Sequence, residues 1–175
     1  MTTSPRKRGF PPVVDARTRL LILGSLPGEA SLAAGEYYGN PRNAFWRLLE
    51  GVLDEALVPL PYAERLAVLQ RHGVGLWDVV AEAERRGSLD SSILKPDAND
   101  LLALVETLPA LRAVAFNGGT AARLGSRLLA PAADRLALIA LPSSSPAHAA
   151  RSLAQKAAAW SVLTSVLDAR STRSD

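Results

Sequence analysis

The stretch LLILGSLPG (residues 20–28) runs from four consecutive aliphatic side chains into a turn of glycine, serine and proline. A short apolar run without alternation is typical of a strand that is buried on both faces of a parallel sheet. Three further runs share this character, at residues 73–80, 113–119 and 136–142, although glycines weaken the first of them. We therefore predict a short parallel sheet of four strands.

Helical periodicity fills the intervals between these runs. Apolar residues recur every three or four positions in five segments that we predict to be helices, at residues 43–53, 63–70, 100–108, 120–129 and 147–167. For the last segment we expect Ser145 as the N-cap and Pro146 at the first helical position. Strands that alternate with helices indicate a parallel sheet with helices on both faces.

The two ends of the chain lack such patterns. Residues 1–18 hold a basic cluster followed by two prolines, which are incompatible with a regular helix, so we expect an irregular basic arm. Residues 19–168 are expected to fold as a single domain, which suits a length of 175 residues. Residues 169–175 are polar and are expected to fray.

Composition excludes several kinds of site. The chain has no cysteine, which rules out disulfides, cysteine-ligated zinc and thiol nucleophiles, and two histidines are too few for a histidine-rich metal site. We therefore expect neither a metal nor a cofactor. No apolar run approaches the length of a membrane span, and the net charge of +3 permits a nucleic-acid partner without requiring one. A cytoplasmic protein is the expectation.

Open α/β sheets bind ligands beyond the carboxyl ends of their strands, so the loops after the apolar runs form the candidate site. Three of these loops consist of small or rigid residues that let a ligand approach the backbone, at residues 24–28, 117–120 and 141–146. Helices that follow directly offer N–H groups to a phosphate or a developing anion. Each loop also has a structural explanation, as a strand-to-helix turn, a left-handed turn at Asn117, or a serine turn with a helix cap.

The segment YYGNPRNAFW (residues 37–46) is the most distinctive in the chain. Asn40 before Pro41 fits a helix N-cap and first turn, the Phe-Trp pair fits the core, and Arg42 fits a solvated charge. Asn43 falls in the predicted first turn of the helix, where an amide has little structural purpose. Asn43 is therefore the residue that folding explains least.

Four segments in this order resemble the uracil-DNA-glycosylase superfamily, and most closely its hypoxanthine-DNA (deoxyinosine) glycosylase branch. They are GSLPG (24–28), YYGNPRNAFW (37–46), GSLDSSI (87–93) and LPSSSPAH (141–148). The resemblance implies a three-layer α/β/α sandwich around a short four-stranded parallel sheet. It also implies base flipping, in which the target nucleotide leaves the stack and enters a pocket at the strand ends.

The resemblance further implies roles for individual residues. Most uracil glycosylases hold the attacking water with an aspartate or asparagine in the first segment, where this chain has Ser25 and Leu26. The hypoxanthine branch shares this loss and uses an asparagine of the second segment, which maps to Asn43, with Asn40 as its rival. The residues expected at the flipped base are Ser25, Leu26, Pro27, Gly28, Tyr38, Phe45 and Asn117, and those expected at the DNA backbone are Arg42, Ser143, Ser144, Ser145, Pro146 and His148.

The leading functional prediction is a monomeric, monofunctional glycosylase of base excision repair. It would remove a deaminated base from double-stranded DNA, with hypoxanthine first and xanthine or uracil as further candidates, and would associate with a bacterial nucleoid through DNA. The alternatives are an enzyme that prefers uracil and a non-catalytic lesion-binding protein, which the leucine at position 26 favours. A nucleoside hydrolase ranks lower, because Asp78 and Asp90 are the only carboxylates near these loops and both are explained as caps.

Overall fold

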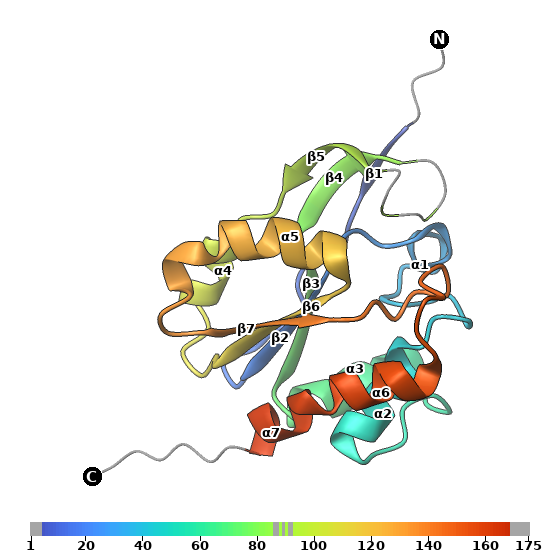
Figure 1. Cartoon of the computed structure of the whole chain (residues 1–175), viewed down its shortest axis with the longest axis vertical. Coiled ribbons are helices and arrows are strands. Elements are labelled where there is room, and N and C mark those ends of the chain that lie inside the picture. Colours follow the sequence, from blue (N-terminus) through green and yellow to red (C-terminus); the bar gives the residue numbers. More distant parts are fainter. Residues whose placement is uncertain (1–4, 86–87, 89, 91–92, 169–175) are drawn as a thin grey trace.

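A central parallel sheet organises the structure, a computed structural model that describes residues 5–85, 88, 90 and 93–168 (Figure 1). Its strands lie in the order β3-β2-β6-β7, and they span β2 Leu20–Gly24, β3 Val74–Asp78, β6 Ala113–Asn117 and β7 Ala137–Leu141. Every pairing within it is parallel. The predicted four-stranded parallel sheet is therefore confirmed.

The continuous apolar run in β2 follows from its place in the middle of this sheet. Successive side chains of a strand point to opposite faces, and both faces of β2 are covered. Leu20 and Ile22 pack into one hydrophobic cluster, whereas Leu21 and Leu23 pack into the other. All four side chains are fully buried, so each contributes about 1.5–3 kcal/mol of hydrophobic stabilisation.

Helices cover the two faces of the sheet as separate layers (Figure 1). One layer contains α2 Phe45–Leu53, α3 Tyr62–Arg71, α6 Leu153–Trp160 and α7 Val162–Asp168. The other contains α4 Leu101–Glu106 and α5 Gly119–Leu128, and the chain also forms the short helices α1 Glu29–Ala34 and η2 Ala130–Ala132. Among the described residues, no helix combines the length and apolarity needed to cross a membrane.

A second, antiparallel sheet was not predicted. It joins β1 Arg6–Arg8, β4 Val80–Glu84 and β5 Leu94–Ala98 in the order β1-β4-β5. The prediction of an irregular arm over residues 1–18 is therefore wrong at β1. Backbone pairing joins β1 to β4, and Arg6 adds ion pairs with Glu82 at 2.8 Å and Asp97 at 2.7 Å.

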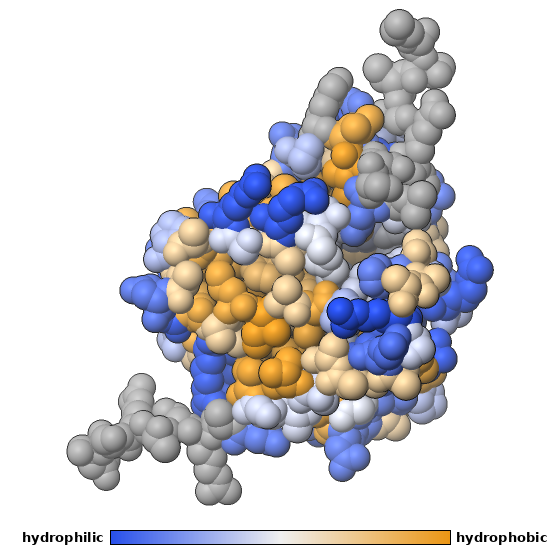
Figure 2. Space-filling view, viewed as in Figure 1, coloured by the Kyte–Doolittle hydropathy of each residue, from blue (hydrophilic) through white to orange (hydrophobic). Residues whose placement is uncertain are grey.

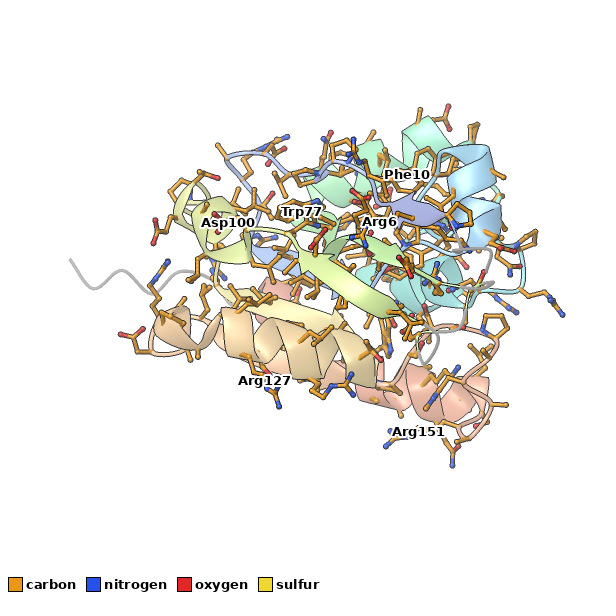
Figure 3. All side chains as sticks on the ribbon, turned by 90° about the horizontal axis from the view of Figure 1, so that it is seen from above. Arg6, Phe10, Trp77, Asp100, Arg127 and Arg151 are labelled. Carbon is orange, nitrogen blue, oxygen red and sulfur yellow. The ribbon has the colours of Figure 1, made fainter. Side chains whose placement is uncertain are left out.

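The rest of the amino-terminal arm lies against the edge strand β3. Val13 forms a bridge with Leu76, and Trp77 Nε1 donates a hydrogen bond to the carbonyl of Phe10 at 3.1 Å. Figure 3 shows Phe10, Trp77 and Arg6 close together on this side of the molecule. Residues 1–4 of the predicted arm, the predicted tail at 169–175, and residues 87, 89, 91 and 92 of the GSLDSSI segment lie outside the described residues.

The predicted helix at residues 147–167 is wrong at its start and is interrupted. Residues 142–152 form a loop, α6 begins at Leu153, and Ser161 separates α6 from α7. Ser152, not Ser145, is the N-cap, because it exchanges hydrogen bonds with Gln155 in a capping box. The Ser145 hydroxyl instead accepts a hydrogen bond from the N–H of Ala147 at 3.2 Å, within the loop.

Strand β7 departs from the burial expected of the apolar runs. It is the edge strand of the sheet, and its residues 137–140 are half-buried or exposed. Figure 2 shows apolar surface gathered over this part of the molecule. An apolar run therefore predicts a strand correctly here without predicting that both of its faces are covered.

Gly125 offers a test of the packing between α5 and the sheet. A methyl group on Gly125 would lie 2.4 Å from Phe116 Cε1, whereas one on the exposed Gly51 in α2 would meet nothing within 4 Å. We expect Gly125→Ala to lower the free energy of unfolding by about 1–3 kcal/mol. The control Gly51→Ala should raise it by about 0.5–1 kcal/mol, because alanine favours a helix. Urea unfolding measures both, and an unchanged stability of Gly125→Ala would contradict this packing.

Candidate active site

A cavity of about 1020 Å³ opens at the carboxyl edge of the parallel sheet. The register brings the strand ends together there, since Gly24 pairs with Asp78 across β2 and β3, and Asn117 pairs with Leu141 across β6 and β7. The loops that follow β2, β6 and β7 line the cavity together with residues 37–43. Its size is in the range of ligand pockets.

The structure brings nearly all of the predicted site residues to this cavity. The lining includes Ser25, Leu26, Pro27, Gly28, Tyr38, Asn40, Arg42, Asn43, Asn117, Ser143, Ser144, Ser145, Pro146 and His148. Phe45 is the exception and corrects the prediction of a base contact. It is fully buried, and its ring stacks on that of Tyr38 at 3.7 Å and 13°. Phe45 therefore supports Tyr38 from the core side.

Asn117 and Ser144 hold two of the lining loops together through a reciprocal pair of hydrogen bonds. Asn117 Nδ2 donates to Ser144 Oγ at 2.8 Å, and the N–H of Ser144 donates to Asn117 Oδ1 at 2.8 Å. Both residues are buried. The N–H of Ala44 donates to the carbonyl of Ser144 at 3.0 Å, so the segment before α2 joins the same network. Asn117 therefore has a structural role beside any role at a base.

Two side chains of α6 contact the loop at residues 141–146, here called the serine loop, and neither contact was predicted from the sequence. Lys156 is buried, and its Nζ donates to the carbonyl of Ser145 at 3.3 Å. Trp160 Nε1 donates to the carbonyl of Pro142 at 2.9 Å. Burial lowers the pKa of Lys156 below its ordinary value, because desolvation disfavours the charged form. These contacts fix both ends of the triplet that faces the cavity.

Asn40 and Asn43 each fold the backbone into a tight turn beside the cavity. Asn40 Oδ1 accepts from the N–H of Arg42 and Asn43 Oδ1 accepts from the N–H of Phe45, both at 3.0 Å. Asn40 is not a helix N-cap, because α2 begins only at Phe45. An amide oxygen has two lone pairs, so these turns fix the side chains while leaving each oxygen able to accept a bond from water.

The loop after β2 is held by a buried arginine. Arg85 is 2% exposed, and its guanidinium donates to the carbonyls of Leu26 and Pro27. Ser25 Oγ donates to Asp90 Oδ1 at 2.6 Å, and that carboxylate lies 3.7 Å from Arg85. The Asp90 carboxylate therefore joins the network that holds this loop. The side chain of Leu26 packs with Val80 and Ala83 in a small cluster.

Asp78 is the functional candidate that sequence reasoning set aside as a cap. It ends β3, lines the cavity and is only 3% exposed, and it caps no helix. Its Oδ2 has no hydrogen-bond partner among the described residues. Burial raises the pKa of Asp78 to about 7, the nearby charge of Asp90 adds to the increase, and Arg85 opposes it. An acid placed directly after an apolar run was the available signal.

Tyr38 and Asp78 approach the same point of the cavity wall. A methyl group on Gly24 would lie 2.7 Å from Asp78 Oδ1 and 3.1 Å from the Tyr38 hydroxyl oxygen, so glycine is required there. Tyr38 adopts a left-handed backbone, with φ of 54°, which is uncommon for an aromatic residue. Its hydroxyl is buried beside the Asn117 side chain, and burial raises its pKa above the ordinary value.

The rim of the cavity is basic. Arg42, Arg123 and His148 are exposed and lie along it. Arg123 belongs to α5, whose first turn starts at the cavity, and was not predicted. Figure 3 shows Arg127 of α5 and Arg151 of the loop before α6 projecting from one side of the molecule, and neither of them lines the cavity. Such a surface suits an anionic backbone.

Comparison with known proteins agrees with this geometry. The family model described as the uracil DNA glycosylase superfamily matches residues 11–164. The chain belongs to this superfamily. A solution NMR structure of a candidate uracil DNA glycosylase from Methanosarcina acetivorans superposes with a TM-score of 0.82 at 39% identity, and the match covers 93% of this chain and 99% of that one.

Two curated relatives carry a more specific name. The hypoxanthine DNA glycosylase of Methanosarcina barkeri is 45% identical over 113 residues, which cover 65% of this chain and 72% of the relative. The protein of the same name from Methanosarcina acetivorans is 46% identical over 112 residues, which cover 64% and 71%. The resemblance drawn from the motifs, including its hypoxanthine branch, is thereby confirmed. As a DNA glycosylase of this superfamily, the chain has DNA as its substrate.

Asp78 predicts a measurable effect of pH on stability. Its pKa of about 7 in the folded protein lies above the ordinary 3.8, so the unfolded chain ionises first and stability falls as pH rises between these values. Asp78→Asn removes this loss. We expect the difference in unfolding free energy between the variant and the wild type to grow in favour of the variant by about 2–3 kcal/mol from about pH 5 to about pH 8. Urea unfolding at both pH values measures the gain.

The exposed Asp134 provides the control for this comparison. Asp134→Asn should change stability equally at both pH values, because its side chain is hydrated in the folded and unfolded states. An Asp78→Asn variant that behaves like this control would show that the Asp78 carboxylate is accommodated in the folded protein without cost.

Proposed function

We propose that this protein flips a deaminated base, hypoxanthine first, out of double-stranded DNA and hydrolyses its N-glycosidic bond. The observation that carries the proposal is the convergence of the Asn40–Asn43 turn pair, Tyr38 and the Asn117–Ser144 pair on one cavity at the strand ends. Relatives named hypoxanthine DNA glycosylase support hypoxanthine as the base.

Asn43 is the residue proposed to position the attacking water. An amide cannot take a proton near neutral pH, but its oxygen can orient a water toward C1′ of the sugar. The bond to the base breaks with its electron pair moving to the base, and the sugar acquires oxocarbenium character before water adds. The turn formed by Asn43 Oδ1 and the N–H of Phe45 holds the amide in place for this task.

The walls of the cavity are proposed to hold the flipped base. The ring of Tyr38, backed by Phe45, offers an aromatic surface for stacking. Asn117 Nδ2 carries a second hydrogen beside the one given to Ser144, and that hydrogen can reach an acceptor of the base. Pro27 and Gly28, in the loop after β2, also line the cavity where the base is proposed to bind.

DNA binding is proposed to use the basic rim and the serine loop. Arg42 and His148 are exposed and can contact phosphates, and Ser143 and Ser145 face the cavity beside them. The protein would act as a monomer, since one cavity contains all of the proposed groups. A genomic duplex as substrate would place it at the nucleoid, within the cytoplasm.

A preference for uracil is the second candidate. The structural similarity to a candidate uracil DNA glycosylase supports it, as does membership of the superfamily. A lesion-binding protein without activity is the third, supported by Leu26 in the place of a water-holding amide. Base release is measured from duplexes that each carry one hypoxanthine, xanthine or uracil. Fastest release of hypoxanthine supports the first candidate, fastest release of uracil the second, and binding without release the third.

Asn43→Ala tests the proposed catalytic residue. We expect the release of hypoxanthine to fall on the order of 100-fold or more, because the attacking water loses its positioning, while the melting temperature stays close to that of the wild type. Asn40→Ala is the matched comparison, since the Asn40 side chain forms the same kind of turn three residues earlier in the chain. If Asn40→Ala abolished release and Asn43→Ala did not, the two roles would be reversed.

Asn117→Ala tests whether Asn117 reads the base or only fixes the serine loop. Ser144→Ala is its matched control, because it removes the Ser144 Oγ that Asn117 Nδ2 contacts and leaves the amide in place. A reading role predicts that Asn117→Ala reduces both the rate and the preference among the three bases, whereas Ser144→Ala reduces the rate alone. Equal effects of the two substitutions on base preference would leave Asn117 with a structural role only.

A further inference from the structure

Asp78 lines the cavity as a buried carboxylate that the fold does not explain. It is 3% exposed, its Oδ2 has no partner among the described residues, and its Oδ1 shares the Gly24 side of the cavity with the Tyr38 hydroxyl. A buried carboxylate without a full set of partners is costly, so a group of this kind at a ligand cavity indicates function.

The chemistry of the proposed function lacks one element that the asparagines cannot supply. When the bond from C1′ to a purine breaks, the electron pair moves onto the base, and a proton delivered to a ring nitrogen neutralises the leaving group. Neither Asn40 nor Asn43 can deliver a proton near neutral pH. His148 and the arginines of the rim are exposed to solvent.

We propose that Asp78 acts as the general acid toward the flipped base. The inference rests on the proposed glycosylase function. The Asp78 carboxyl proton passes to a ring nitrogen of the base as the C1′–N9 bond breaks, and N9 keeps the bonding electron pair. Water adds to C1′, and the proton that it releases restores the Asp78 carboxyl.

The surroundings of Asp78 favour the neutral form that this role needs. Among the described residues, the ionisable groups that act on it are Tyr37 and Tyr38 from the segment before α2, and Arg85 and Asp90 from the connection between β4 and β5. Burial raises the pKa of Asp78 to about 7, with Asp90 adding to the increase and Arg85 opposing it. An acid with a pKa near the working pH is the effective one for proton transfer.

The pH dependence of base release tests the inference. The measurement is the single-turnover rate on a hypoxanthine duplex, with enzyme in excess, between about pH 5.5 and pH 8.5. The wild-type rate should be constant at the acidic end and fall tenfold per pH unit above about pH 7, because the neutral acid is the active form. Asp78→Asn should be slower on the order of 100-fold or more near pH 6, and its rate should not depend on pH in this range.

Asp90→Asn provides the matched control. Its amide oxygen can still accept the bond from Ser25 Oγ, but the negative charge that raises the pKa of Asp78 is lost. The fall in rate should therefore move to lower pH in this variant, and this shift does not depend on the folding of Asp78→Asn. Binding to a duplex with an abasic site should be unchanged in Asp78→Asn, because an abasic nucleotide presents no base to protonate.

Three results would overturn the inference. A wild-type rate that is flat or rises with pH would exclude a neutral acid, and so would an Asp78→Asn rate within about threefold of the wild type near pH 6. Each of these leaves the proposed glycosylase function intact. Absence of base release by the wild type at every pH would instead overturn the proposed function, and this inference with it.

Discussion

The parallel, in-register pairing of four strands is the constraint on which the rest of the structure depends. It aligns the carboxyl ends of β2, β3, β6 and β7 along one edge, which places Gly24 beside Asp78 and Asn117 beside Leu141. The helical layers bury both faces of the central strands, so this edge is where the loops meet solvent. The position of the cavity therefore follows from the packing of the sheet.

Hydrogen bonds across the loops then turn this edge into a rigid site. The Asn117–Ser144 pair joins the ends of β6 and β7, and the bond from Ala44 to Ser144 ties the segment before α2 to them. Arg85 holds the loop after β2 through two carbonyls. A site whose walls are fixed before a ligand arrives loses little free energy in ordering them, which is a requirement for positioning a water or a proton.

The sequence predicted the parts of the fold that rest on hydrophobic burial. Four apolar runs became the four strands, because burying side chains such as those of β2 inside a sheet removes their apolar surface from water. The antiparallel sheet was missed because its strands are short and largely polar, and the charged residues of β1 leave no periodic apolar signal. Residues 147–152 were predicted as helix because Ser145-Pro146 resembles a cap, whereas the capping box lies at Ser152.

Sequence motifs predicted part of the candidate site, but they did not predict the residues whose roles depend on burial in the fold. The motifs located the asparagine segment and the serine loop, but they gave Phe45 a contact that its buried stacking on Tyr38 prevents. Asp78 was set aside because a sequence does not show which carboxylate lacks partners in the fold. Lys156 was not identified for the same reason, since it becomes buried behind the serine loop only when α6 docks.

The central claim is that the cavity at the strand ends receives a flipped base between Tyr38 and the asparagine segment. A crystal structure of Asn43→Ala bound to a duplex with one hypoxanthine tests it most directly, because the variant keeps the walls and should not turn over the substrate. We expect an extrahelical hypoxanthine stacked on the Tyr38 ring, with the Asp78 carboxyl within hydrogen-bond distance of a base nitrogen. A base that stays stacked in the duplex, or one that binds outside this cavity, would contradict it.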